Sequence, residues 1–416
     1  MTTDTIKTTA RSARRLAVAK QRLSGRLPSG ASREEILQTI RELGYIQRDS
    51  VNVVAPSHIL SIWARIGNFQ LSDLEKLLWE EKKIFVHWTP MASLVLTEDY
   101  LLYNSLMKRY PDSLSSSWGT QRTQARKFMS EHMELGKRML GELEKNPLMP
   151  SEFKDYPKAK KSKVAWTHSS DITQMLHHLH MSGEVMVVGH QGNNNVWGLS
   201  EKFLPEWTDK REISEEEFER EASQRAIRAL GTATPKEINF YFVRGRYNNL
   251  KKTLAQLQEE SLIHRITVEE FGKRDERYVH DQDIELLDSL GTGNFEPRMS
   301  LLPPFDNLIC STDRTSRVFG FNYVREQFLP KEKRRYGTYV LPILLGDEFI
   351  GRIDPRMDYE NSKLLINSVH AEENAPADRE VVHIIRDKIE QMAEVLGADE
   401  VKFGPMIPEI WSKSLH

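Results

Sequence analysis

Gln47 and Asp49 are the two residues of this sequence whose types and spacing could do chemistry. They follow a predicted helix over 32–43 and precede an apolar run at 51–54 that should be buried. In extended backbone, side chains two positions apart project from the same side. An amide and a carboxylate placed in this way could hold one water molecule between them. The alternative, that Asp49 or Ser50 only caps the next helix, stays open from these residues alone.

The rest of the sequence lacks the common signatures of enzymes, since it contains no GxxxxGK, GxGxxG, HExxH or GxSxG motif. His177, His178 and His180 share one predicted helix, but no two of them stand four residues apart. A metal site is therefore not favoured, and we expect exposed helix histidines. The single cysteine, Cys310, excludes an internal disulfide, and we expect a small buried strand residue rather than a nucleophile. We predict neither a metal nor another cofactor.

The elements around the polar pair belong to a plan that the sequence repeats three times, helices followed by a short pair of strands. In the first stretch, Ser32 and Glu35 form a capping box before an apolar stripe, and a strand follows at 84–88. The second stretch has a helix over 170–180 and two strands joined by a turn at 192–195. Both stretches have the order of a winged helix.

The third stretch shows the plan most clearly. Thr234 and Glu237 start a helix that has Pro235 correctly placed at its first position. One more helix and two strands follow, which we expect at 249–260, 262–268 and 277–280. This order is that of a winged helix-turn-helix.

From about residue 299, alternating or apolar runs typical of strands replace the helical patterns. We expect these strands at 317–328, 339–345, 349–354 and 363–370, with a final amphipathic helix over 379–396. The predicted fold class is α+β, with three tandem winged helix-turn-helix modules and an antiparallel β-rich C-terminal domain. The expected domains are an N-terminal arm with the first winged helix and the polar pair (1–103), a helical connector (104–153), the second winged helix (154–210), the third (211–295) and the C-terminal domain (296–416).

Basic clusters stand out against a net charge of only −2. They lie in residues 1–26, between Lys154 and Lys163, and at 331–335. Such clusters on a near-neutral protein suit a face that contacts phosphates, although solvated linkers would look the same. The residues that we expect to contact DNA are Lys160, Lys161, Lys163, Lys333, Arg334, Arg335 and Tyr336.

Composition narrows the class of protein further. The 416 residues are 39% hydrophobic and 28% charged, which indicates a globular chain of several modules. No apolar run reaches the roughly 18–20 residues that span a bilayer, and the N-terminus has no apolar signal core. With a single cysteine, we expect a reducing cytoplasm. Nothing indicates a coiled coil, so we expect a monomer.

Two long segments of the sequence resemble one known family, the winged-helix DNA glycosylases of the AlkZ and AlkX (YcaQ-type) kind. The first runs from Leu43 to His58 and on to Trp63 and Arg65. The second comprises Pro304 to Leu308, Phe319 to Phe321 with Tyr323 and Glu326, Lys333 to Gly337 with Tyr339, Leu341 to Pro342, and Gly351 to Asp354. The motif Gln47-Arg48-Asp49 is similar to that of the Gln-x-Asp branch, which has the broader specificity.

The resemblance implies a concave DNA-binding architecture and a monofunctional glycosylase that removes N-alkylated bases and unhooks interstrand crosslinks joined through guanine N7. Asp49 would be the catalytic carboxylate and Gln47 its aligner, while His58 and Arg65 would join the DNA-binding residues. The partner would be double-stranded DNA with alkylated or crosslinked purines, in the cytoplasm of a bacterium and associated with the nucleoid. The alternative is a non-catalytic winged-helix DNA-binding protein, such as a regulator or a damage-binding factor.

Overall fold

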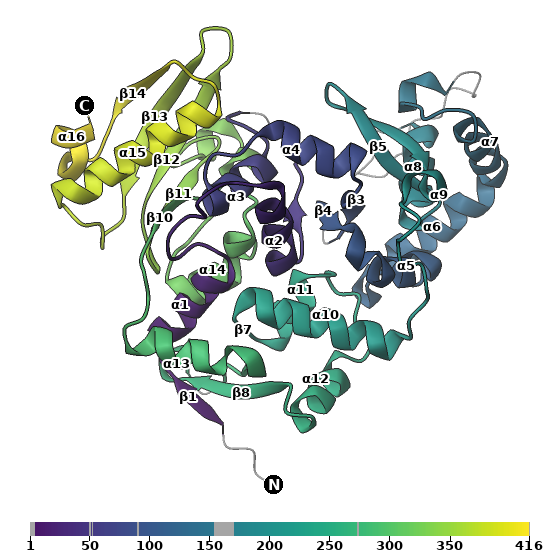
Figure 1. The fold of residues 1–416 in the computed structure, drawn as a ribbon, viewed down its shortest axis with the longest axis horizontal. Coiled ribbons are helices and arrows are strands. Elements are labelled where there is room, and N and C mark those ends of the chain that lie inside the picture. Colours follow the sequence, from purple (N-terminus) through teal and green to yellow (C-terminus); the bar gives the residue numbers. More distant parts are fainter. Residues whose placement is uncertain are drawn as a thin grey trace. The chain divides into compact units, whose positions relative to one another are not determined.

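The computed structural model describes residues 5–49, 51, 53–89, 91–153, 170–272 and 274–415. The chain divides into two compact units (Figure 1). Unit 1 comprises Met1–Asp73, Gln224–Ile238 and Ala255–His416, and unit 2 comprises Leu74–Ser223 and Asn239–Leu254. Lys160, Lys161 and Lys163 lie outside the described residues, so their contact with DNA stays a prediction.

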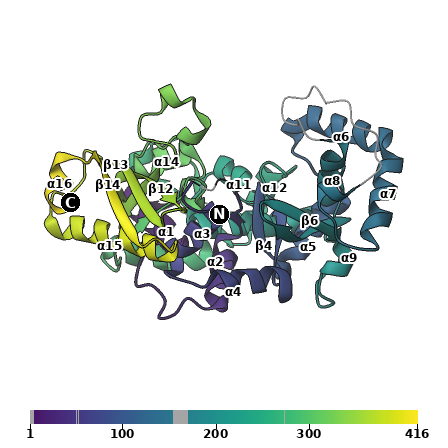
Figure 2. The same cartoon turned by 90° about the horizontal axis from the view of Figure 1, so that it is seen from above.

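A five-stranded sheet forms the C-terminal part of unit 1. Its strands, in spatial order, are β10 (Met299–Leu301), β11 (Leu341–Leu345), β12 (Glu348–Asp358), β13 (Lys363–Ala371) and β14 (Glu400–Met406). Neighbouring strands are antiparallel except for β13 and β14, which are parallel. Helix α15 (Arg379–Val395) connects this parallel pair and lies alongside the sheet, and α16 (Glu409–Leu415) packs on α15 (Figures 1 and 2).

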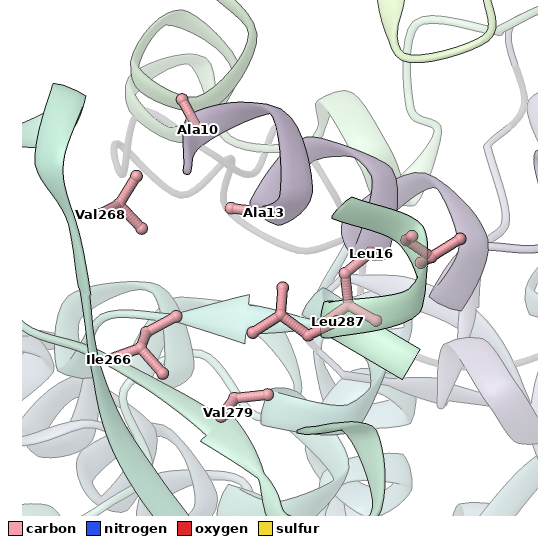
Figure 3. Packing of buried hydrophobic residues seen from close by; sticks show 8 residues of the cluster. Ala10, Ala13, Leu16, Ile266, Val268, Val279 and Leu287 are labelled. Carbon is pink, nitrogen blue, oxygen red and sulfur yellow. The ribbon is translucent and has the colours of Figure 1, made fainter. Parts of the chain in front are cut away.

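A second sheet of unit 1 packs against the N-terminal helix. It contains, in spatial order, β1 (Ile6–Thr8), β8 (Ile263–Val268), β9 (Arg277–His280) and β7 (Thr232–Ala233). Helices α1 (Ala10–Lys20) and α13 (Ile284–Thr292) pack on each other and share a core with this sheet. Figure 3 shows the buried side chains that meet there: Ala10, Ala13, Leu16, Ile266, Val268, Val279 and Leu287. Apolar burial, at about 25 cal/mol per Å², thus joins the first residues of the chain to a segment more than half its length away.

Three elements of unit 1 flank the polar pair. Helix α2 (Arg33–Leu43) begins at Ser32, whose hydroxyl caps it, and ends at Gly44 with a φ of 80°. That left-handed conformation favours glycine, which has no Cβ. Strand β2 (Ile46–Gln47) follows, and α3 (Ser57–Ile66) begins ten residues later. A further helix, α14 (Thr312–Phe319), lies between β10 and β11 in the chain.

Unit 2 contains two antiparallel hairpins among helices. The hairpins are β3 (Ile84–Trp88) with β4 (Ala92–Leu96), and β5 (Val185–Gln191) with β6 (Asn194–Leu199). The helices are α5 (Tyr100–Lys108), α6 (Gly119–Glu131), α7 (Met133–Leu143), α8 (Asp171–Met181) and α9 (Ser200–Phe203). The boundaries between the units fall within α4 (Leu71–Glu75), α10 (Glu215–Leu230), α11 (Pro235–Tyr241) and α12 (Leu250–Glu259).

The predicted order of helices and hairpins is confirmed in all three stretches, and so is the α+β class. Ser170 caps α8 as expected, and Thr234 and Glu237 form the reciprocal capping box at the start of α11. The five-domain division and the assignment of each stretch as a winged helix stay predictions. Among the described residues, no helix is both long and apolar enough to cross a membrane.

Two predictions about the C-terminal part were wrong. The segment 317–328 is not a strand, because Ser311 caps α14 and Gly320 ends it in a left-handed conformation. The large sheet is not wholly antiparallel, because the helical crossover α15 leads into β14, a strand that we did not predict. A crossover of that length returns the chain in the same direction, which gives a parallel pair.

Candidate active site

Both carboxylate oxygens of Asp49 accept hydrogen bonds from the backbone. The Val51 N–H donates to Oδ1 at 2.5 Å, and the Ser57 N–H donates to Oδ2 at 2.9 Å. Ser57 is the first residue of α3, and Pro56 occupies the N-cap position of that helix. Asp49 is therefore not the N-cap residue, although it accepts the first N–H of the helix from outside it. Each carboxylate oxygen can accept more than one hydrogen bond, so this role leaves lone pairs for a water molecule or a sugar.

The surroundings of Asp49 change its acidity. Partial burial raises the pKa of its carboxyl above the ordinary 3.8, and the hydrogen bonds from Val51 and Ser57 oppose that rise. A carboxylate with a raised pKa is a stronger proton acceptor once it is ionised. Gln47, at the end of β2, is half-buried, as Asp49 is. The two predicted catalytic residues thus lie on one short segment, and the backbone hydrogen bonds hold the Asp49 carboxylate in place.

The segment that carries Asp49 is held from the C-terminal part of unit 1. The Asn307 amide donates to the Tyr45 carbonyl at 2.9 Å, on the near side of the polar pair. On the far side, the Tyr359 hydroxyl donates to the Val54 carbonyl at 2.6 Å. Two further hydrogen bonds hold the same segment. The Tyr339 hydroxyl donates to the Ala55 carbonyl at 3.3 Å, and the Met357 backbone N–H donates to the Val53 carbonyl at 2.9 Å. The position of Asp49 therefore depends on residues far away in the sequence.

Sequence reasoning missed these anchoring residues. Asn307 and Tyr339 lie inside the segments that resemble the family, but no local pattern assigned them a partner. A buried amide or hydroxyl needs a hydrogen-bond partner, which was the available signal. Asn307 is 1% exposed and Tyr339 is fully buried, and burial raises the pKa of the Tyr339 hydroxyl, with the nearby Asp49 charge as a further cause.

Arg65 is not a DNA contact, which corrects that prediction. Its side chain is fully buried and forms a two-pronged ion pair with Asp306, whose side chain is equally buried. The same guanidinium donates from Nε to the Gln21 carbonyl at 2.9 Å. A guanidinium that is fully buried cannot reach a phosphate while the protein is folded, so Arg65 is a structural residue.

His58 lies in the first turn of α3, one residue beyond the N–H that Asp49 accepts. Burial, reinforced by the Arg48 charge, lowers the pKa of the imidazole to about 3. The ring is therefore neutral at physiological pH and could offer DNA a hydrogen bond but no charge. Its contact with DNA stays a prediction.

The basic residues at 331–336 divide into exposed and structural side chains. Lys331, Lys333 and Arg335 are exposed, in agreement with a phosphate-contacting role. Arg334 is half-buried and donates to the Leu329 carbonyl and the Thr338 hydroxyl, both at 3.0 Å, so its guanidinium is engaged within the loop. This engagement argues against the predicted DNA contact of Arg334.

Tyr336 lies beside the exposed arginine. Its ring has the guanidinium of Arg352 at 4.2 Å and that of Arg335 at 5.0 Å, and it meets His370 edge-on. Tyr336, Arg335 and His370 line an open cavity of about 490 Å³. The half-buried ring thus forms part of the lining of this cavity, and its contact with DNA stays a prediction.

Two predictions about reactive side chains were wrong in detail. His178 and His180 are buried rather than exposed, because α8 packs its face against rings of unit 2, among them Tyr110 and His87. Cys310 is half-buried at the end of a short 3-10 turn and not in a strand, and burial raises the pKa of its thiol to about 11. Among the described residues, no cluster of three or more His, Cys, Asp or Glu could hold a metal ion.

Comparison with known proteins identifies a family and a similar fold. The family model described as DNA glycosylase AlkZ-like matches residues 40–398, a range that contains Gln47, Asp49 and all of their anchoring residues. Among solved structures, the fold is similar to that of Streptomyces sahachiroi DNA glycosylase AlkZ, with a TM-score of 0.65 and 16% identity. The alignment covers 97% of this chain and 100% of that chain. At this identity the structural likeness shows the fold alone.

Proposed function

Because the chain belongs to the AlkZ-like DNA glycosylase family, we propose that it hydrolyses the N-glycosidic bond of N7-alkylguanine-type bases in double-stranded DNA. We propose further that it unhooks interstrand crosslinks joined through such bases, and that it is a monofunctional enzyme that acts as a monomer. The observation that carries the proposal is the geometry of Asp49, a half-buried carboxylate fixed by two backbone N–H donors.

The chemistry of the substrate decides what the enzyme must supply. An alkyl group on N7 gives guanine a positive charge, so the base leaves without being protonated. As the bond breaks, positive charge develops on the sugar, as in glycoside hydrolysis. A fixed negative charge near C1′ and a placed water molecule are therefore sufficient. The Asp49 carboxylate would supply the charge and accept the proton of the attacking water.

The fixed position of Asp49 supports this role. A carboxylate that is already oriented does not have to reorganise as the sugar becomes cationic, which is the main source of electrostatic catalysis. The hydrogen bonds from Val51 and Ser57 occupy one acceptor position on each oxygen. The remaining positions can face water and deoxyribose, and the Gln47 amide would orient that water from the end of β2. A water so placed could attack the anomeric carbon.

The test compares base release by the wild type with that by Asp49→Asn and Gln47→Ala, under single-turnover conditions on a duplex that contains one N7-methylguanine. Mild alkali cleaves the strand at the abasic site that each released base leaves, and a denaturing gel resolves the break. We expect Asp49→Asn to lose about 10²–10³-fold in rate. Asp313→Asn is the matched control, because that carboxylate is 74% exposed and pairs with Lys236 on the surface.

Two measurements make the result decisive. Thermal unfolding and binding to undamaged DNA show whether each variant is folded. If folded Asp49→Asn kept the wild-type rate, Asp49 would only support the start of α3 and have no part in catalysis. If the wild type itself bound DNA but released no base, the non-catalytic alternative would hold. A duplex crosslinked through guanine N7 tests the unhooking activity separately.

A further inference from the structure

The loop that follows α14 exposes an apolar ring. Phe328 is 67% exposed, more than any other large hydrophobic side chain of the described residues, and Val324 of the same loop is 52% exposed. In Figure 2 this stretch of chain extends away from the sheet as a green loop beyond α14. Leaving a phenyl ring in water forgoes roughly 1.5–3 kcal/mol of burial, so an exposed ring indicates a binding role more strongly than an exposed charge does.

Exposed basic residues follow this ring in the same loop. Lys331 and Lys333 follow it within five residues and are exposed, as is Arg335. Beneath it, Phe328 meets the edge of Phe305, with ring centroids 6.1 Å apart. The combination of an exposed aromatic face and basic side chains fits a polyanion that carries flat, stackable groups.

Hydrogen bonds hold the loop that carries the exposed Phe328 in one conformation. The buried Glu326 carboxylate accepts, through Oε2, the N–H groups of Arg335, Tyr336 and Gly337 at 2.8–3.1 Å. These three bonds close the loop at its base, and Arg334 ties its interior to the Leu329 carbonyl. Charge-assisted bonds of this kind are about twice as strong as neutral ones. The ring of Phe328 is therefore held out at a defined position beside the closure.

We propose that Phe328 stacks on an unpaired or unstacked nucleobase of the bound DNA, while Lys331, Lys333 and Arg335 contact the flanking phosphates. A glycosylase must distort the duplex around its target base, and each distortion leaves a base without its stacking partner. An inserted apolar side chain can replace that partner. The proposal rests on DNA as the substrate, and not on the catalytic role of Asp49.

The test uses inert DNA, so it does not depend on catalysis. One duplex carries 2-aminopurine opposite a tetrahydrofuran abasic analogue, and a second duplex is fully paired. We expect Phe328→Ala to bind the abasic duplex about 5- to 150-fold more weakly, the factor that corresponds to about 1–3 kcal/mol of stacking, and to bind the paired duplex as the wild type does. The wild type should also quench the 2-aminopurine fluorescence, and Phe328→Trp should restore what Phe328→Ala loses.

Two control variants separate stacking from other effects. Val324→Ala truncates another exposed apolar side chain of the same loop and should change neither affinity. Lys333→Ala should weaken binding to both duplexes alike and reduce the salt dependence by about one phosphate contact. Equal affinities of Phe328→Ala and the wild type for the abasic duplex would overturn the proposal, as would equal losses on both duplexes. Neither result would bear on base release by Asp49, which is measured separately.

Discussion

The Arg65 guanidinium and the Asp306 carboxylate form a bidentate ion pair in the core of unit 1, with Nη1–Oδ2 at 2.6 Å and Nη2–Oδ1 at 3.0 Å. The two residues are 241 positions apart in the sequence, and both side chains are fully buried. Asp306 is the neighbour of Asn307, which holds the segment with Asp49. The ion pair therefore fixes the frame of the candidate active site.

Removal of one partner of this pair should destabilise the protein strongly. We expect Arg65→Met to lower the free energy of unfolding by about 3–5 kcal/mol, because it leaves the Asp306 charge buried without compensation. The double variant Arg65→Met/Asp306→Leu should lose less than the sum of the single variants. Urea unfolding measures these differences. Lys236→Ala, which breaks an exposed pair with Asp313, should leave the urea midpoint unchanged.

The pH dependence of base release should report the ionisation of Asp49. Burial raises the pKa of its carboxyl above 3.8, and only the ionised form can accept the proton of water. The rate should therefore fall as the pH decreases through a pKa above that value. Single-turnover rates on N7-methylguanine, whose charge is permanent, test this after subtraction of the rate without enzyme. The residual rate of Asp49→Asn should not fall in this way at low pH. If the variant kept the wild-type decrease at low pH, the group that titrates would be a residue other than Asp49.

The buried histidines of unit 2 should make its stability sensitive to acid. Burial lowers the pKa values of His178 and His180 from 6.5 to about 4. The unfolded chain takes up these protons below pH 6.5 while the folded chain stays neutral, so stability is lost as the pH falls from 6.5 towards 4. Each histidine should contribute about 2 kcal/mol of this loss between pH 7 and pH 5.

The variant His180→Asn isolates one of these contributions. The asparagine amide can replace Nδ1 as the donor to the Val185 carbonyl, which lies 3.1 Å from that atom, but it does not titrate. Urea unfolding of this variant should depend less steeply on pH than unfolding of the wild type. His383→Asn, on the exposed side of α15, is the control and should keep the wild-type dependence.

Gly337 should not tolerate a side chain. A Cβ at this position would overlap the Asp354 carboxylate, and its φ is +151°. Asp354 accepts the N–H groups of Thr338 and Tyr339, both at 2.9 Å, so it cannot move away freely. We expect Gly337→Ala to cost about 1–3 kcal/mol or more in unfolding experiments and to weaken DNA binding through the displaced loop. Gly272→Ala, with φ +84° and open space around it, should cost only the backbone strain.

Local sequence signals predicted most of the helices and hairpins, since each depends on a few neighbouring residues. Ser32, Ser170 and Thr234 begin helices where their capping patterns indicated. The segment after Ser311 was misjudged because alternating apolar residues outweighed a helix start and the terminating Gly320. Strand β14 was missed because Gly404 and Pro405 interrupt its alternation.

The candidate residues of the site could be proposed from the sequence, but the contacts that hold them in place could not. Gln47 and Asp49 could be chosen from their types, spacing and family resemblance. The hydrogen-bond partners of Asp306, Glu326 and Asp354 could not be chosen in this way. Each of these carboxylates accepts from donors that come near it only when the chain has folded. Arg65 shows the limit most clearly: a basic residue in a segment that resembles the glycosylase family was expected to contact phosphate, and its buried counterion became known only from the fold.

The anchoring of the Asp49 segment has a consequence for protein synthesis. The Val54 carbonyl accepts a hydrogen bond from Tyr359, which is synthesised 305 residues later, and the Ala55 carbonyl accepts one from Tyr339, which is synthesised 284 residues later. A ribosome-bound chain thus exposes its carboxylate long before the residues that orient it have been made. Fragments from premature termination ahead of these tyrosines should be inert towards DNA, so that competence for base removal arises only when nearly the whole polypeptide has been completed.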